Sequence, residues 1–170
     1  MAITDELRCI LELLEQGFYE LKFAFEGMDS INLWRRPAES ILSAGEIAGH
    51  LAYWEAVRLA GEGEDLSLCN VKSLLVDNRF RYFSHNLPSE ISPELAAMSP
   101  EDVWFELQRV HAESLQNLDL INPDTDAKIP GDPSGFTYKQ YLQYAVFHTA
   151  YHCGQIYTIR HLLGETTPDN

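Results

Sequence analysis

Four long segments of this chain carry apolar side chains at alternating steps of three and four residues, the spacing of a helix that buries one face. The first covers about residues 5–26, and its apolar stripe is Leu7, Ile10, Leu11, Leu14, Phe18, Leu21 and Phe25. No segment shows a convincing strand pattern. Four such helices in 170 residues predict one all-α domain over residues 1–170, built as a four-helix bundle.

Capping signals mark the ends of the first two helices. Thr4 can cap the first helix, and Gly27 can end it. Ser43 with Glu46 three residues later forms a capping box, flanked by an apolar pair that completes a hydrophobic staple. The second helix is therefore expected to span about residues 44–61.

The third and fourth helices carry similar signals. Ser99 caps the third helix and Pro100 suits its first position, and Asn122 closes it before a proline. The fourth begins with a capping box formed by Thr137 and Gln140 and runs to residue 164.

The connection over residues 62–98 limits the topology. A loop of that length without structure is unusual in a compact domain, so residues 71–83 are predicted to form a short helix over the bundle. The long crossover lets the second and third helices run parallel. The resulting order is up-down-down-up, with the second helix antiparallel to the fourth.

Two histidines on the fourth helix suggest a metal site. His148 and His152 are four residues apart, so both imidazoles point to one side of the helix. His50, on the second helix, is the proposed third ligand. At a rise of about 1.5 Å per residue, all three reach the same height only if the two helices are antiparallel.

Three neutral imidazoles with an open coordination position suit a divalent transition metal, with zinc or nickel favoured and iron, manganese or copper as alternatives. Cys153 points about 100° away from His152 and is a poor fourth ligand. Glu46 is a candidate general base that its capping role also explains, and Gln155 is a candidate for orienting a water. His111, beside Val110 and Leu107 on the third helix, is more simply interpreted as a satisfied core histidine or a half-exposed one than as a fourth ligand.

The net charge of −14 repels phosphate backbones and anionic membrane surfaces, so neither nucleic acid nor a membrane is an expected partner. No signal peptide or spanning segment fits, and three widely spaced cysteines suggest free thiols in a cytoplasmic protein. Aromatic residues make up 11% of the chain, more than a small core readily hides. Together with the family resemblance given next, this content leads us to expect a homodimer through outward apolar surface.

Two stretches resemble the metal-ligand motifs of the DinB-like superfamily. The first covers residues 41–51 with the upstream 33–37, and the second covers 148–156 and continues to 160–164. The resemblance implies an up-down-down-up bundle with a three-histidine metal site, here His50, His148 and His152. Members with known activity are mostly thiol-handling enzymes, including bacillithiol and mycothiol transferases and mycothiol-dependent maleylpyruvate isomerase.

Three functional hypotheses follow. The leading one is a metal-dependent enzyme acting on a small-molecule substrate, either a thiol S-transferase that uses a low-molecular-weight thiol or a hydrolase. The second is a non-catalytic module for metal binding or dimerisation. The third is a bundle that keeps its histidines but has lost its substrate pocket. The sequence does not name the substrate, the thiol or the native metal.

Overall fold

The computed structural model describes residues 5–60, 65–81 and 90–168. Four long helices dominate this part of the chain: α1 (Asp5–Phe25), α3 (Ala44–Leu59), α5 (Pro100–Ile121) and α6 (Tyr138–Leu162). Three short elements lie in the connections, namely α2 (Ser30–Leu33), the 3-10 turn η1 (Asn78–Phe80) and α4 (Pro93–Ala96). Lys128 and Thr137 form one isolated antiparallel bridge before α6.

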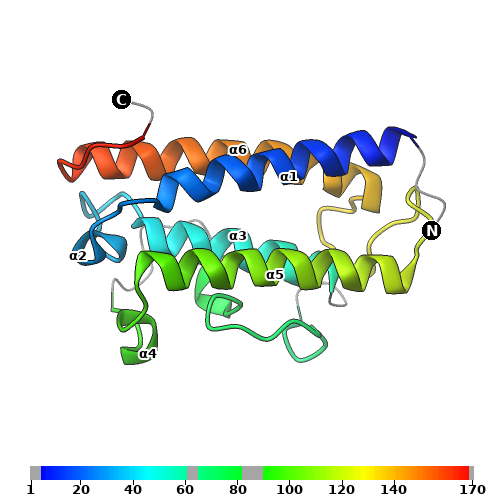
Figure 1. Ribbon diagram of the computed structural model, residues 1–170. Helices are drawn as coiled ribbons and strands as arrows, with labels where there is room; N and C mark the ends of the chain where they lie inside the picture. The colour runs from blue at the N-terminus through cyan, green and yellow to red at the C-terminus, as the bar shows by residue number, and fades with distance from the viewer. Residues whose placement is uncertain (1–4, 61–64, 82–89, 169–170) are drawn as a thin grey trace.

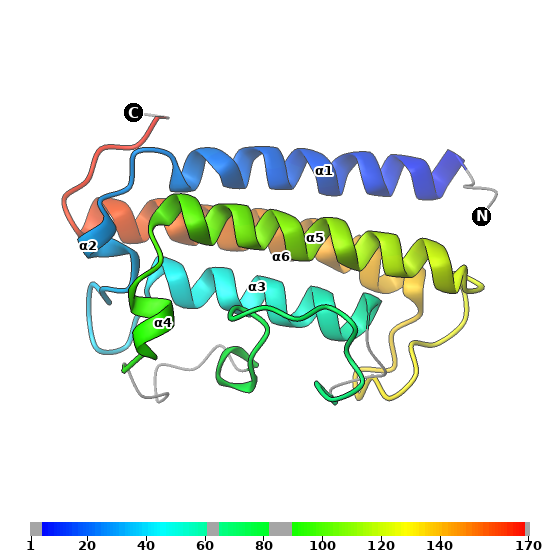
Figure 2. The same cartoon turned by 60° about the horizontal axis from the view of Figure 1, so that its bottom comes forward.

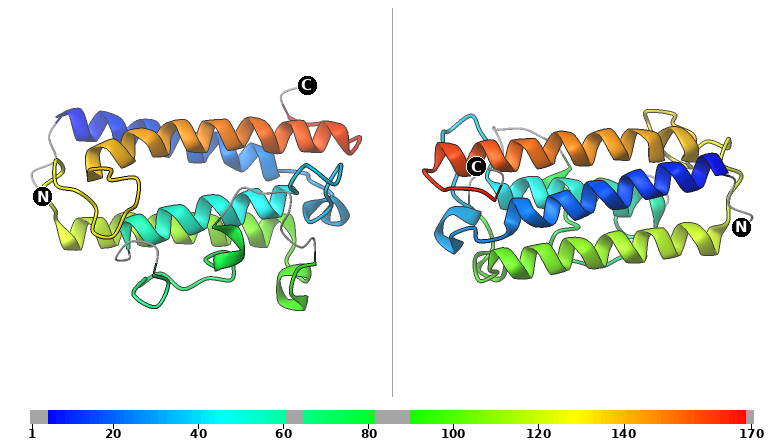
Figure 3. Two further views of the ribbon diagram at one scale, coloured as in Figure 1. Left: turned by 180° about the vertical axis from the view of Figure 1, so that it is seen from behind. Right: turned by 45° about the horizontal axis from the view of Figure 1, so that its top comes forward.

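The four long helices form a bundle with the predicted up-down-down-up order (Figure 1). Helices α1 and α6 run in the same direction, and α3 and α5 both run in the opposite direction (Figures 1 and 2). Seen from behind, α3 and α6 are antiparallel and lie in front of α5 and α1 (Figure 3, left). This arrangement allows residues near the start of α3 to meet residues in the second half of α6.

The predicted helix boundaries are confirmed where the structure describes them. Capping boxes close the starts of α3, α5 and α6, each with a serine or threonine bonded to the amide three residues on. Gly27 and Gly164 follow α1 and α6 with φ of +67° and +83°, a conformation that glycine adopts without strain. The predicted cap Thr4 lies outside the described residues.

The prediction of a helix over residues 71–83 is wrong for the described part of that segment. Only the short turn η1 forms, capped by Asp77, whose carboxylate accepts a hydrogen bond from the amide of Arg79. Side chains of α3 hold this segment in place: the Trp54 indole N–H donates to the carbonyl of Arg81 at 2.8 Å. Because α3 supplies partners for its backbone groups, the segment does not need the internal bonds of a helix.

Arg160 fastens α6 to the end of α1. It is 2% exposed, and its Nη1 donates to the carbonyls of Ala24 and Glu26 at 2.9 and 3.0 Å. Glu165 accepts from Arg160 Nε at 2.8 Å and from Asn32 Nδ2 at 2.7 Å. Charge-assisted bonds of this kind are stronger than neutral ones and fix α6 lengthwise against α1.

Candidate metal centre

His50, His148 and His152 meet between α3 and α6, and all three are buried. Nε2 of His148 lies 3.0 Å from Nε2 of His152 and 3.3 Å from Nε2 of His50. Of the described residues, these three form the group of histidine, cysteine and acidic side chains with the spacing of a metal site. The antiparallel arrangement predicted for α3 and α6 therefore does bring His50 to the histidine pair.

The orientation of His50 is set by the segment that crosses α3. Its Nδ1 lies 2.9 Å from the carbonyl oxygen of Phe80, which can only accept, so Nδ1 carries the proton and Nε2 carries a lone pair. Phe80 approaches because Gly49 has no side chain: a Cβ there would lie 2.5 Å from the Phe80 ring. Gly49 therefore helps to orient His50, because it lets Phe80 come close enough for its carbonyl to accept the bond from His50.

His152 is oriented by its own helix. Its Nδ1 lies 2.7 Å from Oε1 of Gln155, and Nε2 of the same amide donates to the Tyr151 hydroxyl at 3.0 Å. The amide presents its oxygen to His152, and an amide oxygen only accepts, so Nδ1 of His152 is the donor and Nε2 is unprotonated. Outer partners of this kind hold metal-binding histidines in one tautomer and orientation.

The donor set fits a divalent transition metal. Neighbouring nitrogens of a tetrahedral zinc site with bonds of 2.0–2.1 Å are separated by about 3.3 Å. The two Nε2 separations here, 3.0 and 3.3 Å, are close to that value. At least two of the converging nitrogens present lone pairs, an arrangement that a cation stabilises.

Burial keeps these imidazoles neutral. It lowers the pKa of His148 to about 2 and that of His152 to about 4, with the neighbouring histidines adding to the effect. Burial also lowers the pKa of His50, although the Phe80 carbonyl opposes it. Neutral imidazole is the form that coordinates metals, so few protons compete for these nitrogens at neutral pH.

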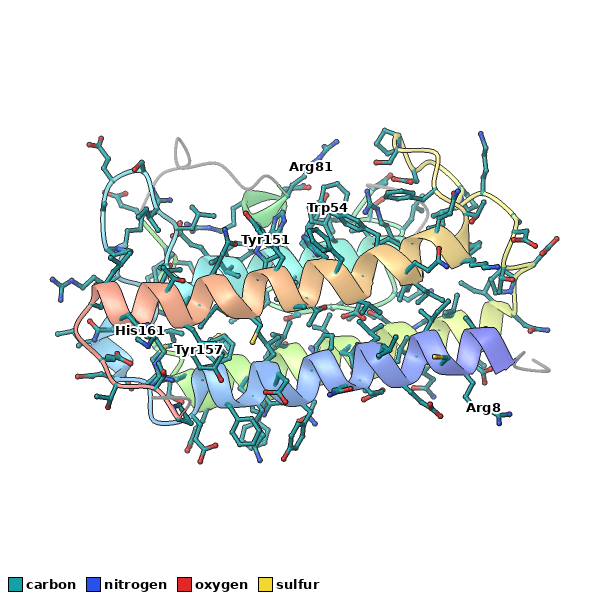
Figure 4. The ribbon with its side chains drawn as sticks, turned by 90° about the horizontal axis from the view of Figure 1, so that it is seen from above. Arg8, Trp54, Arg81, Tyr151, Tyr157 and His161 are labelled. Carbon is teal, nitrogen blue, oxygen red and sulfur yellow. The ribbon has the colours of Figure 1, made fainter. Side chains whose placement is uncertain are left out.

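Aromatic rings surround the cluster. Tyr144 stacks on His148 with ring centroids 5.3 Å apart, and Tyr151 meets His152 edge-on at 5.1 Å. Tyr144 and Tyr151 are 37% and 50% exposed, so this side of the cluster adjoins solvent. Figure 4 shows Tyr151 and Trp54 close together at mid-length of the bundle, with Arg81 beyond them.

The predicted catalytic residues occupy different positions. Gln155 contacts the cluster directly through His152. Glu46 is 5% exposed, accepts from the backbone and hydroxyl of Ser43 at 2.9 Å each, and receives two hydrogen bonds from Arg36 at 2.5 and 2.9 Å. These contacts support a structural role for Glu46, as cap of α3 and anchor for the residues before it.

The remaining histidines lie elsewhere or outside the described residues. His111 pairs with Glu55 at 2.7 Å and stacks on Phe18, in agreement with its reading as a core histidine. His161 lies 3.0 Å from the Thr167 hydroxyl at the end of the bundle. His85 lies outside the described residues. Cys153 is buried, and none of the three cysteines forms a disulfide.

Sequence reasoning missed two contributors. The Phe80 carbonyl belongs to the backbone, and no side-chain pattern marks it. Arg58 is a buried cation that helps to lower the pKa of His50 and of His148, after burial. It lies over the Trp54 ring at 4.3 Å and pairs with Asp132 at 3.2 Å. Arg58 is a charged residue in the mostly apolar second half of α3, three residues after Glu55.

Comparison with known proteins supports the fold. No protein-family profile and no curated protein sequence matches the chain. A solved structure does match: YfiT from Bacillus subtilis, with a TM-score of 0.60 and 18% identity over 97% of this chain and 92% of that one. YfiT is described as a probable metal-dependent hydrolase with an unusual four-helix bundle topology. The chain therefore has the YfiT-like fold that its resemblance to the DinB-like superfamily implied.

Proposed function

We propose that this protein is a metal-dependent hydrolase whose metal is held by His50, His148 and His152. The observation that carries the proposal is the convergence of three Nε2 atoms, with Nδ1 of two rings fixed by the Phe80 carbonyl and the Gln155 amide. The description of YfiT as a probable metal-dependent hydrolase supports the same reading.

Three histidines leave at least one coordination position for a water, whose pKa a bound zinc or nickel ion would lower toward neutrality. The surrounding residues keep the imidazoles neutral and orient His50 and His152 through hydrogen bonds to Nδ1. Gln155 acts as a positioning residue, because its amide oxygen and nitrogen are engaged by His152 and Tyr151. The Tyr151 hydroxyl accepts from Gln155, so its own proton is free to donate to a substrate oxygen.

A thiol S-transferase is the second candidate. The resemblance to thiol-handling enzymes supports it, and the same neutral donor set would accept a thiolate in place of water. The two reactions differ in the nucleophile and not in the protein ligands. A non-catalytic metal-binding module would use the same three histidines without a substrate. The predicted homodimer and cytoplasmic location remain predictions; in the described residues no helix is long and apolar enough to span a membrane.

The experiment measures metal content, helix content and turnover on one preparation. Elemental analysis should give one zinc or nickel ion per chain. Hydrolysis of a panel of neutral esters and amides should be assayed before and after chelation. Conjugation of an electrophile to cysteine, or to another thiol that contains cysteine, should be assayed in the same way. We expect ester or amide hydrolysis that stops with metal removal and returns with metal.

Circular dichroism of the chelated protein is the control. The helices have their own apolar stripes and capping boxes, so most helix content should remain without metal. Loss of helix on chelation would make the metal structural and overturn the proposal. Metal-dependent thiol conjugation without hydrolysis would assign the transferase, and retained helix with no turnover would favour the binding module.

A further inference from the structure

A pocket lies next to the three-histidine cluster, on the side toward the end of α6. It has a volume of about 320 Å³ and lies between the start of α3 and the end of α6. Gln155 lines it while holding His152 at 2.7 Å, so cluster and pocket share a side chain. Ile47 lines the opposite wall, one helical turn before His50.

The lining of the pocket is aliphatic and uncharged. Five of its residues have branched aliphatic side chains: Ile41, Leu42, Ile47, Ile159 and Leu162. None of the described residues that line it is charged or aromatic. The two polar groups nearest the cluster already have partners, because Thr158 donates to the Gly154 carbonyl and the Gln155 amide is engaged at both ends.

This lining selects the chemistry of an occupant. A carboxylate, phosphate or ammonium group would lose its hydration without gaining an ion pair. An alkyl chain has no such hydration to lose, and each methylene that it buries makes the free energy of binding more favourable by about 0.8 kcal/mol. The volume lies near the lower end of small-molecule sites, about 300–1,000 Å³, which suits one short chain.

We propose that this pocket binds an uncharged aliphatic chain of the substrate, whose reactive group then lies at the three histidines. The inference rests on the proposed function and narrows its substrate class to molecules with a neutral alkyl or acyl chain. The aromatic side chains Tyr144 and Tyr151 contact His148 and His152 but do not line the pocket, so the surroundings of the cluster and the lining of the pocket differ in chemistry.

The test uses primary alcohols as probes, since their binding requires neither metal nor turnover. Isoleucine and leucine methyl NMR signals of the full chain are followed while butan-1-ol, hexan-1-ol or hexanoate is added. We expect saturable shifts at Ile41, Ile47, Ile159 and Leu162. Affinity should rise about fourfold per methylene, the factor that corresponds to about 0.8 kcal/mol. Hexanoate should bind more weakly than hexan-1-ol.

Thr158→Trp provides the blocking variant. Thr158 is exposed on α6 and lines the pocket, so an indole can fill the space without disturbing the core. The matched control is Gln116→Trp, at an exposed position on α5 that does not line the pocket. We expect Thr158→Trp to weaken hexan-1-ol binding at least tenfold and Gln116→Trp to change it less than twofold.

The outcomes separate this inference from the proposed function. If alcohols bind in the pocket but no ester, amide or thiol substrate turns over, the hydrolase proposal falls and the aliphatic site stands. If esters are hydrolysed equally at all chain lengths and alcohols do not shift these methyl signals, the pocket inference alone falls. A dimer that Thr158→Trp converts to a monomer in light scattering, without alcohol binding, would make the pocket a subunit interface and overturn the inference.

Discussion

Two buried groups lie on different sides of α3, one with three histidines and one with His111 and a carboxylate. The histidine pKa is lowered in the first group and raised in the second. His50 faces α6 and joins His148 and His152. Glu55, five residues further along α3, faces α5 and pairs with His111 at 2.7 Å. Five residues correspond to about 140° around a helix, so one helix supplies both centres on different faces. Both are buried to a similar degree, and their neighbours make the difference.

At the three-histidine cluster the neighbours are imidazoles and, further away, the cation Arg58. Burial and these neighbours act together, and the pKa of every histidine falls. At His111 burial by itself would lower the pKa, but the carboxylates of Glu55 and Glu15 outweigh it and the pKa is raised. Burial therefore does not decide the charge of a histidine here. The carboxylate partner does. Among the described residues no carboxylate joins the three-histidine group, which leaves its lone pairs for a metal.

The largest expected effect is loss of metal on replacing a ligand. His50→Ala, His148→Ala or His152→Ala should each weaken metal binding by at least about a hundredfold, more than the 10–100-fold typical of outer partners. Elemental analysis after dialysis against a defined metal buffer measures this. His161→Ala, on the same helix but at its exposed end, is the control and should keep its metal. Full occupancy in His50→Ala would remove His50 from the site.

The second effect concerns stability and not metal. His111→Leu removes the imidazole that pairs with Glu55 and leaves a carboxylate that is 5% exposed. Breaking a buried ion pair from one side costs about 3–5 kcal/mol, so the free energy of unfolding in urea should fall by that order. Metal content should not change.

A double variant sharpens the interpretation. In Glu55→Met with His111→Leu neither charge remains, and a well-packed apolar replacement is often nearly neutral. The double variant should therefore recover most of the loss. If it is no more stable than His111→Leu, shape and not charge dominates this centre, and the contrast between the two groups would lose its electrostatic basis.

The sequence predicted best those features that depend on periodic patterns or on residues close together in the chain. The helix stripes, the two predicted capping boxes, the Ser99 cap and the His148–His152 pair all depend on residues within four positions of one another. His50 could be added because the helix rise and an antiparallel arrangement fix its height. The Phe80 carbonyl could not be found this way, since it reaches His50 from a segment that forms no regular helix and depends on a close approach at Gly49.

The pairing of His111 with Glu55 was equally hidden. The two residues are 56 positions apart on parallel helices, and neither stands in a motif. The sequence suggested a satisfied core histidine but offered no means to choose its partner. Long-range polar pairs depend on the rotation of each helix about its axis, which an apolar stripe defines only to within a broad sector.

A third, intermediate effect should follow from Gln155→Leu. The substitution removes the acceptor that holds the proton on Nδ1 of His152 and leaves all three ligands in place. Metal affinity should fall about 10–100-fold, as for other outer partners of ligating histidines. Competition titration with a chromophoric chelator measures it. Gln155→Glu supplies a stronger acceptor and should retain or increase affinity. Equal losses in both variants would indicate that Gln155 matters for packing only.

The smallest expected effect is on the pH dependence of stability in metal-free protein. The contributions of the two centres to the free energy of unfolding should change with pH in opposite directions. His111 has a raised pKa in the folded state, so its contribution to stability is full below the ordinary value of about 6.5 and is lost as pH rises through the folded pKa. His152 has a folded pKa of about 4. The unfolded chain binds its proton first, and stability falls as pH drops from about 6.5 toward 4.

Urea unfolding of the wild type, His111→Leu and His152→Leu at pH 5 to 8 measures both slopes. The stability difference between wild type and His111→Leu should shrink above about pH 6.5, by at most about 1.4 kcal/mol per pH unit. The stability of the wild type relative to His152→Leu should instead decrease below that pH, because the wild type buries one more imidazole whose pKa is lowered by folding. Parallel slopes would mean that the two groups share one electrostatic environment, and that the carboxylate of Glu55 does not separate a charged histidine from the neutral metal-binding ones.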